Sequence, residues 1–293
     1  MKGEIMYNTI IVQPFGWLLR TTYNFIGSYG ISIIIFTILA KMILLPLQMK
    51  SKKSMMEMNR LQPKIKELEK RYKDDKNKYS MEVSKLYKEE GVSMFGGCLP
   101  LLITLPIMIG LYSVVRQPLT HIFQVTASQI NEIAEALRAA GVTAGLTGAA
   151  EKSAYMLEIG VASHLKDYGE IISEIVPKLS GVDFSFLGID LAAIPNFKYI
   201  TPLWAIPILS GLTAWLSNFV IRKFSGNTAQ QNQQMGMMNL MMPLMSIYIA
   251  FVVPAGLGLY WIISNILTAV QEPLLTKYYK KKAEQKALEG DKK

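Results

Sequence analysis

Five long apolar stretches alternate with polar segments along the chain. They cover residues 30–49, 94–115, 200–221, 237–253 and 256–275. Each is long enough, or nearly so, to cross about 30 Å of hydrocarbon as a helix. The last two meet at Pro254, Ala255 and Gly256, where a proline close to a glycine predicts a tight turn. The pattern predicts an all-α integral membrane protein with five transmembrane helices.

Charge in the connecting segments predicts the orientation. Residues 50–92 carry 13 Lys/Arg against 8 Asp/Glu, 222–235 carry 2 against none, and 276–293 carry 7 against 3. Residues 117–200 instead carry 5 against 9. Because a Lys/Arg excess marks cytoplasmic segments, the N-terminus is expected outside and the C-terminus inside. The formal net charge of +9 is therefore largely a topology signal.

These signals divide the chain into ten consecutive segments. We predict an external interfacial amphipathic helix over 1–27, spans over 28–49, 93–116, 200–222, 236–253 and 256–275, a cytoplasmic helical hairpin over 50–92, an external loop with a helical insertion over 117–199, a cytoplasmic loop over 223–235, and a basic cytoplasmic tail over 276–293. For the first segment, an amphipathic helix is preferred over a degenerate secretory signal because Tyr7 to Ile26 lacks a small-residue cleavage site.

The hairpin and the external insertion are both expected to be helical. In the hairpin, apolar residues recur at spacings of three and four before a polar turn at 74–77, and Gly91 suits a helix end. It either links two spans or binds a partner, and the sequence does not choose. Outside, amphipathic helices are predicted around 125–140 and 151–176 in a loosely packed insertion of about 125–180 with no strand-rich pattern.

One charge interrupts the first apolar run. Lys41 lies nine residues from Lys50, or roughly 13 Å along a helix, which places it near the bilayer midplane. An unpaired ammonium there costs about 2.5 to 3.5 kcal/mol. A water-filled cavity offsets that cost best, and uncharged polar residues of the spans could line it: Ser32, Thr37, Thr104, Ser210, Thr213, Ser217, Asn218, Ser264, Asn265 and Thr268. Singly, such residues usually hydrogen-bond between helices.

The composition argues against an enzyme. The only histidines are His121 and His164, and Cys98 is the only cysteine, so no metal spacing and no internal disulfide exist. No nucleophile–base set, HExxH, P-loop or GxGxxG is present, and Glu272 is the only carboxylate near a span. We expect no covalent catalysis, no cofactor and no metal. Methionine clusters at 49–58 and 235–245 suit a surface that accepts varied apolar segments.

Three separated strings carry a resemblance to a known family. They are KMILLPLQMKSKKSMMEMNRLQPKIKELEKRYKDDKNK from Lys41, LYKEEGVSMFGGCLPLLITLPIMIGLY from Leu86 and MMPLMSIYIAFVVPAGLGLYWIISNILTAVQ from Met241. Each string lies next to a predicted span, and the three follow one another in the order that is typical of that family. The chain resembles the YidC/Oxa/Alb family of membrane protein insertases in its short Gram-positive form, over residues 28–120 and 183–275.

This resemblance implies a membrane protein insertase and chaperone of the bacterial plasma membrane, with a hydrophilic groove open to the cytoplasm and the lipid. Lys41 holds the place of the family's usual groove arginine, and Thr104 and Ser217 fall where glutamine is common. The implied groove residues are Lys41, Thr104, Ser217, Asn218, Trp261, Ser264 and Asn265. The implied apolar substrate contacts are Met55, Met58, Met237 and Met241, and the implied ribosome or lipid contacts are Lys277, Lys280, Lys281 and Lys282.

The implied partners are nascent membrane proteins and anionic lipids, with the ribosome and the Sec translocon as further candidates. The external insertion departs from the short loop of the family, and the long sandwich domain of the Gram-negative relatives is absent. Two other functions stay open: a small channel or transporter in which Lys41 binds an anion, and a structural assembly factor that needs no wet groove. We find no internal repeat of the kind that many transporters show.

Overall fold

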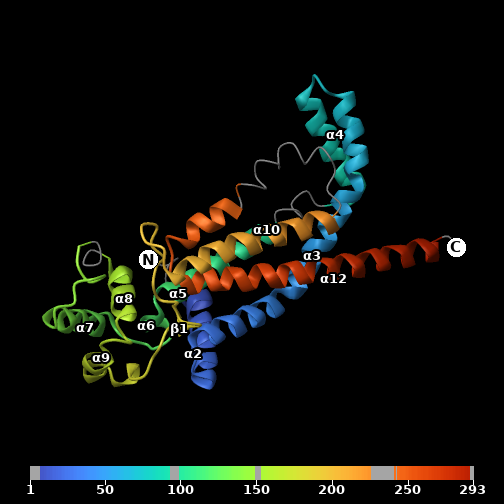
Figure 1. Ribbon diagram of the computed structural model, residues 1–293. Coiled ribbons are helices and arrows are strands. Elements are labelled where there is room, and N and C mark those ends of the chain that lie inside the picture. Colours follow the sequence, from blue (N-terminus) through green and yellow to red (C-terminus); the bar gives the residue numbers. More distant parts are fainter. Residues whose placement is uncertain (1–6, 93–98, 149–152, 226–240, 242, 291–293) are drawn as a thin grey trace. The chain divides into compact units, whose positions relative to one another are not determined.

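The computed structural model describes residues 7–92, 99–148, 153–225, 241 and 243–290. Figure 1 shows the helices and strands of the chain, which divides into two compact units. Unit 1 comprises Met1–Ala40, Pro106–Ala214 and Met242–Asn265, and unit 2 comprises Lys41–Leu105, Trp215–Met241 and Ile266–Lys293. Both are mostly helical, which confirms the predicted helical class.

Two helical segments in the described part of the chain are long and apolar enough to cross a membrane. They are α3 (Tyr29–Arg71) and the segment Pro202–Phe224, which combines the short helix η4 (Pro202–Trp204) with most of α10 (Ala205–Ser225). The second predicted span lies largely in α5 (Leu99–Arg116), and the fifth lies in α12 (Ala255–Gly290). Much of the fourth falls outside the described residues, although 243–250 are helical.

The helix that contains the first predicted span continues beyond residue 49. Helix α3 continues without a break for 43 residues, so the apolar run and the first arm of the hairpin are one helix. Pro46 and Pro63 lie inside it, each removing one backbone donor. The second arm, α4 (Lys76–Glu89), begins where the Asp75 side chain accepts a hydrogen bond from Lys78 N at 2.9 Å.

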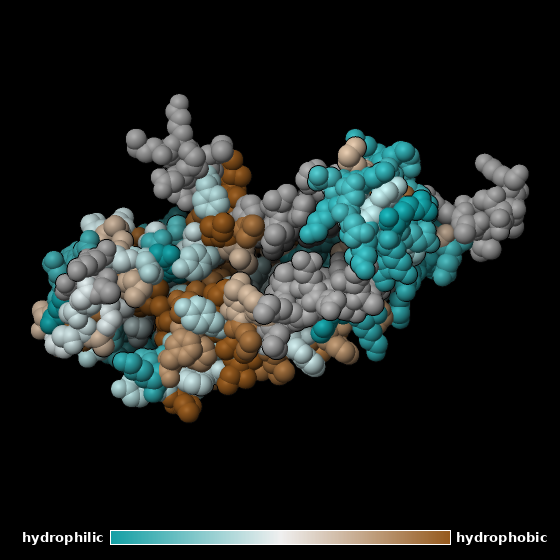
Figure 2. Space-filling view, turned by 90° about the horizontal axis from the view of Figure 1, so that it is seen from above, coloured by the Kyte–Doolittle hydropathy of each residue, from teal (hydrophilic) through white to brown (hydrophobic). Residues whose placement is uncertain are grey.

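The hairpin has a small core of its own. Leu61 and Ile65 of α3 pack with Tyr87 and Val92, and Met58, Tyr79, Val83 and Leu86 pack around them. Gly91 adopts φ +64°, which allows the chain to leave α4 in the left-handed conformation that glycine favours. In Figure 2, which is seen from above and faces the hairpin tip, hydrophilic residues cover the outside of the hairpin.

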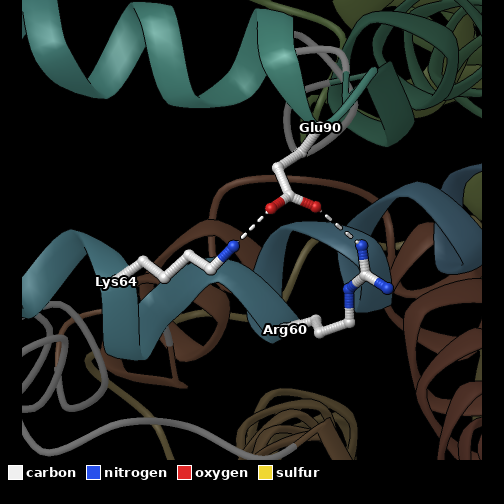
Figure 3. Close-up of polar contacts among 3 residues, drawn as sticks. All are labelled: Arg60, Lys64 and Glu90. Carbon is white, nitrogen blue, oxygen red and sulfur yellow. Dashed lines mark hydrogen bonds and ion pairs between the residues drawn. The ribbon is translucent and has the colours of Figure 1, made fainter.

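An ion-pair bridge ties the hairpin's second arm to its first. Glu90 accepts hydrogen bonds from Lys64 and from Arg60, the latter at 3.0 Å (Figure 3). The hydrogen bond and charge of Lys64, together with the charge of Arg60, lower the pKa of Glu90. Because all three groups contact water, the apolar contacts between the arms contribute more to stability than this bridge does.

The helical insertion predicted over about 125–180 is well packed, which corrects the expectation of loose packing. It contains α7 (Ala127–Ala139), α8 (Ala154–Ser163) and α9 (Gly169–Ile175). Ile133, Leu137, Leu146 and Ile172 are all 0% exposed. A Cβ at Gly160 would lie 2.0 Å from the carbonyl oxygen of Gly145, so only glycine permits this approach between α8 and the loop before it.

The single helix expected over 151–176 is also wrong in its extent. The structure ends α8 at Ser163 and begins α9 at Gly169. The break follows a run of six buried residues, 157–162, after which His164 Nε2 bonds the Ala144 carbonyl at 2.9 Å. A straight helix would carry the following residues away from these contacts.

A minimal two-stranded ladder completes unit 1, where no strand pattern was expected. Strands β1 (Ser185–Phe186) and β2 (Ile189–Asp190) pair antiparallel, with Phe186 opposite Ile189. Phe186 packs on the backbone of Gly30, where a Cβ would lie 2.3 Å from the ring. After β2, the carbonyls of Leu191 and Ala193 accept the first N–H groups of α12 from Gly256 and Ala255, at 2.8 and 2.9 Å.

The N-terminal segment packs on the same unit. It consists of the π-helix η1 (Asn8–Val12) and α2 (Gln13–Ile26). Val12 and Leu19 are buried, while Trp17 and Phe25 are 57% and 88% exposed. The helix therefore presents apolar side chains both to the protein and to its surroundings, as expected of a helix at a membrane interface.

A buried carboxylate joins the insertion to the segment that follows α5. Glu158 of α8 is 0% exposed and accepts hydrogen bonds from Thr120 N at 2.9 Å, Thr120 Oγ1 at 2.7 Å and Gln117 Nε2 at 3.4 Å. Burial raises the pKa of Glu158, against the opposing effect of these hydrogen bonds. Burial outweighs them because the site excludes water from both carboxylate oxygens.

We expect Leu61→Ala to open the hairpin. Truncating this 1%-exposed side chain should destabilise the two arms by about 2–5 kcal/mol, because it leaves a cavity in a core of few residues. Hydrogen exchange of the α4 amides should accelerate accordingly. The matched control Met81→Ala, 72% exposed on α4, should change the exchange free energy by less than about 0.5 kcal/mol, and equal effects of the two would refute this account of the hairpin.

The raised pKa of Glu158 predicts a pH-dependent insertion. The pKa of this carboxyl is higher in the folded protein than in the unfolded chain, where it is about 4.3. The protonated group therefore adds most to the free energy of unfolding below the unfolded pKa, and this contribution is lost as the pH rises through the folded pKa. Glu158→Gln should flatten this slope in thermal unfolding measured from pH 4 to pH 8 (roughly the range over which such a group titrates). Exposed Glu170→Gln is the control, and an unchanged slope in Glu158→Gln would contradict the assignment.

Candidate functional site

The ammonium of Lys41 has a defined partner on another helix. Its Nζ donates a hydrogen bond to Thr268 Oγ1 of α12 at 2.8 Å, and both residues belong to unit 2. Within the part of the chain that the structure describes, Lys41 makes no ion pair. A hydroxyl satisfies one of its three donors and leaves its charge uncompensated. The site therefore offers a net positive charge inside an apolar helix.

Other polar contacts join the same two helices further along. Gln271 Nε2 donates to Gln48 Oε1 at 2.6 Å, and Tyr279 OH donates to the Met49 carbonyl at 2.9 Å. Lys52 forms an ion pair with Glu272. These contacts are also within unit 2.

The predicted groove residues of unit 1 have neutral partners. Asn265 Nδ2 donates to Thr213 Oγ1 at 3.4 Å, and Ser264 hydrogen-bonds with the hydroxyl of Tyr260. Trp261 is half-buried against the core of unit 1. These side chains form a band of weakly polar groups on α12 and α10, without a charge of their own.

The structure describes two of the three remaining predicted groove residues, Ser217 and Asn218. Ser217 is buried, and Asn218 is half-buried one residue further along α10. Both lie in unit 2 with Lys41. The side chain of Thr104 lies outside the described residues, so its place in a groove stays a prediction.

The predicted apolar contacts are only partly available. Met55 is half-buried on α3, and Met241 is 56% exposed. Met58 packs against the hairpin core, so much of its surface is already used there. Met237 lies outside the described residues.

The predicted cationic tail forms an exposed helical surface. Lys277, Lys280, Lys281 and Lys282 all lie on the exposed part of α12. The first three are spaced by three and four residues, which places them on one face of the helix. Among the described residues, no group of His, Cys, Asp and Glu could hold a metal ion.

Comparison with known proteins identifies the family. The family model described as 60Kd inner membrane protein matches residues 21–283. The chain belongs to this family. It is 31% identical over 272 residues to the membrane protein insertase YidC of Fusobacterium nucleatum, covering 93% of this chain and 97% of the relative. It is also 31% identical to YidC 1 of Listeria monocytogenes, covering 95% of this chain and 75% of that protein.

A longer relative matches over only part of its length. The YidC of Mannheimia succiniciproducens is 32% identical over 272 residues, which cover 93% of this chain but 38% of the relative. These matches confirm the YidC/Oxa resemblance that the three strings suggested, and they extend it over most of the chain.

Sequence reasoning missed the partners of Lys41 and Lys52. The sequence marks Thr268 as a polar residue of a predicted span but gives no reason to pair it with Lys41, and none to pair Gln48 with Gln271. The available signal is spacing: 41, 48 and 52 fall on one helical face, as do 268, 272 and 279. Such a signal shows which residues share a face but not which helix that face meets.

Proposed function

We propose that this chain is a membrane protein insertase that acts without covalent catalysis. The relatives that match nearly its whole length are named membrane protein insertase YidC. The observation that carries the proposal is Lys41, a positive charge within an apolar helix whose only described hydrogen-bond partner is a neutral hydroxyl. A charge held this way has a free-energy reason to interact with an anionic group that arrives from outside the fold.

The proposed mechanism lowers the barrier for a polar flank to cross the membrane. An apolar substrate segment lies against the spans, with Trp261, Met55 and Met241 contributing to the contact surface, while its flank enters a hydrated groove. Lys41 attracts acidic residues of that flank. Asn265, Ser264, Ser217, Asn218 and Thr104 replace part of the hydration that the flank loses. Substrate passage then requires stabilisation by charge and water, and no bond is made or broken.

The membrane arrangement follows from the charge pattern. We propose five spans with the N-terminus outside and the C-terminus in the cytoplasm, in a bacterial plasma membrane. Support comes from the continuous helix α3, which joins an apolar run to a hairpin rich in lysine, and from the two long apolar helices. The hairpin would capture substrates at the cytoplasmic face.

The lysines of the tail provide a separate contact. Lys277, Lys280 and Lys281 share an exposed face and have a spacing that suits phosphate groups of anionic lipid or of ribosomal RNA. A Sec translocon is a further proposed partner, for which the family resemblance alone argues.

Reconstitution of the protein alone in liposomes tests the function. Wild type and Lys41→Arg should insert a short single-span substrate with an acidic external flank. Lys41→Ala should insert it about tenfold more slowly, since roughly 1.4 kcal/mol of lost transition-state attraction corresponds to that factor. A substrate with a neutral flank serves as the matched control and should be affected much less.

Equal insertion of acidic-flank substrates by Lys41→Ala and wild type would refute the electrostatic role. No insertion by the wild type, together with a Lys41-dependent flux of small anions through the same liposomes, would instead favour a channel.

A further inference from the structure

A seam of polar contacts joins α3 to α12 along the part of unit 2 that follows Lys41. It comprises Lys41 to Thr268, Gln48 to Gln271, Lys52 to Glu272, and Tyr279 to the Met49 carbonyl. The proposed use of Lys41 accounts for the first contact only. The proposed role of Lys41 does not explain the other three contacts.

The three contacts between side chains run in the same order along both helices, whereas the contact of Tyr279 with the Met49 carbonyl departs from that order. From Lys41 the side-chain partners on α3 follow at seven and eleven residues, and on α12 they follow Thr268 at three and four. These intervals return to one face of a helix. The three side-chain pairs therefore favour one rotation and one axial register of α3 against α12.

Both helices contain a proline within the seam. Pro46 lies between Lys41 and Gln48, and Pro273 follows Glu272 directly. Each proline removes one backbone hydrogen bond of its helix and permits bending there. The direction of α3 on the two sides of Pro46 thus depends on contacts made by side chains, which the seam supplies.

The ion pair is the most buried polar contact of the seam. The side chains of Lys52 and Glu272 are 3% and 12% exposed. Charges so far from water are tolerated when they are paired. A buried pair of this kind selects one register more strongly than apolar contacts would, because apolar side chains accept many neighbours.

We propose that Lys52 and Glu272 are positioning residues: their ion pair locks the register of α3 against α12 and thereby holds Lys41 in place for the substrate. The proposal rests on the proposed function for the role of Lys41, but the lock itself is a property of the two helices. The pair does not contact the substrate.

Cross-linking tests the lock without reference to insertion. Gln48→Cys and Gln271→Cys, introduced together into the full-length protein with Cys98→Ser, should be joined by a short bifunctional thiol reagent in liposomes. Lys52→Glu and Glu272→Lys should each lower the cross-linking rate about tenfold, and the double swap Lys52→Glu/Glu272→Lys should restore most of it. Glu272→Gln provides a milder variant if a charge reversal prevents folding.

A neighbouring pair offers a matched control. On the same helix, Lys53 Nζ lies 3.6 Å from Glu57 Oε1, and the two side chains are 63% and 43% exposed. Lys53→Glu makes the same change of charge one residue from Lys52 and should alter cross-linking by less than about twofold. A loss in Lys53→Glu as large as that in Lys52→Glu would overturn the proposal, as would failure of the double swap to restore cross-linking.

Insertion assays then test whether the ion pair acts through Lys41. Glu272→Lys should slow insertion of acidic-flank substrates about tenfold in the wild-type background and should cause no further loss in Lys41→Ala, because both changes remove the same interaction. Additive losses would show that Glu272 acts independently of Lys41 and would contradict the positioning role. If Lys41→Ala itself has no effect, the proposed function fails, while cross-linking still decides on the lock.

Discussion

A protonated amine within an apolar helix constrains this molecule more than any other group. Lys41 cannot reach bulk water along its helix without crossing a long apolar run, and the structure gives it one hydroxyl, that of Thr268, at 2.8 Å. Two of its donors then require water or a substrate. Hydration at this depth needs a cavity, and a cavity with a fixed positive charge attracts acidic segments. The proposed insertase activity makes use of this constraint, and membership of the family favours it over a channel.

The continuity of helix α3 connects Lys41 to the other polar contacts of unit 2. One helix carries the apolar run, Lys41, the polar seam with α12 and the first arm of the hairpin. Its backbone is weakened at Pro46, so side-chain contacts with α12 have to maintain its direction. The hairpin has its own apolar core around Leu61, and unit 1 has another around Ile133 and Leu137. Each part thus keeps its own shape while α3 passes through both units.

The sequence predicts what depends on local chemistry. The helical class, the hairpin turn capped by Asp75 and the glycine at residue 91 follow from periodicity and backbone preference. Packing between distant segments could not be predicted this way. The partner of Lys41 lies 227 residues away along the chain. The break between α8 and α9 follows six consecutive buried residues, 157–162, whose neighbours the sequence does not reveal. The compactness of the insertion depends in part on the close approach of Gly160 to Gly145, which composition does not reveal.

Accessibility of the position of Lys41 to water tests the central claim most directly. In a Cys98→Ser background, Lys41→Cys can be treated with a membrane-impermeant maleimide in inside-out and in right-side-out vesicles. The account predicts labelling in the inside-out vesicles, where the cytoplasmic side faces the reagent, and none in the right-side-out vesicles. Labelling from the external side, or no labelling from either side in protein that labels after detergent is added, would contradict a hydrated groove open to the cytoplasm.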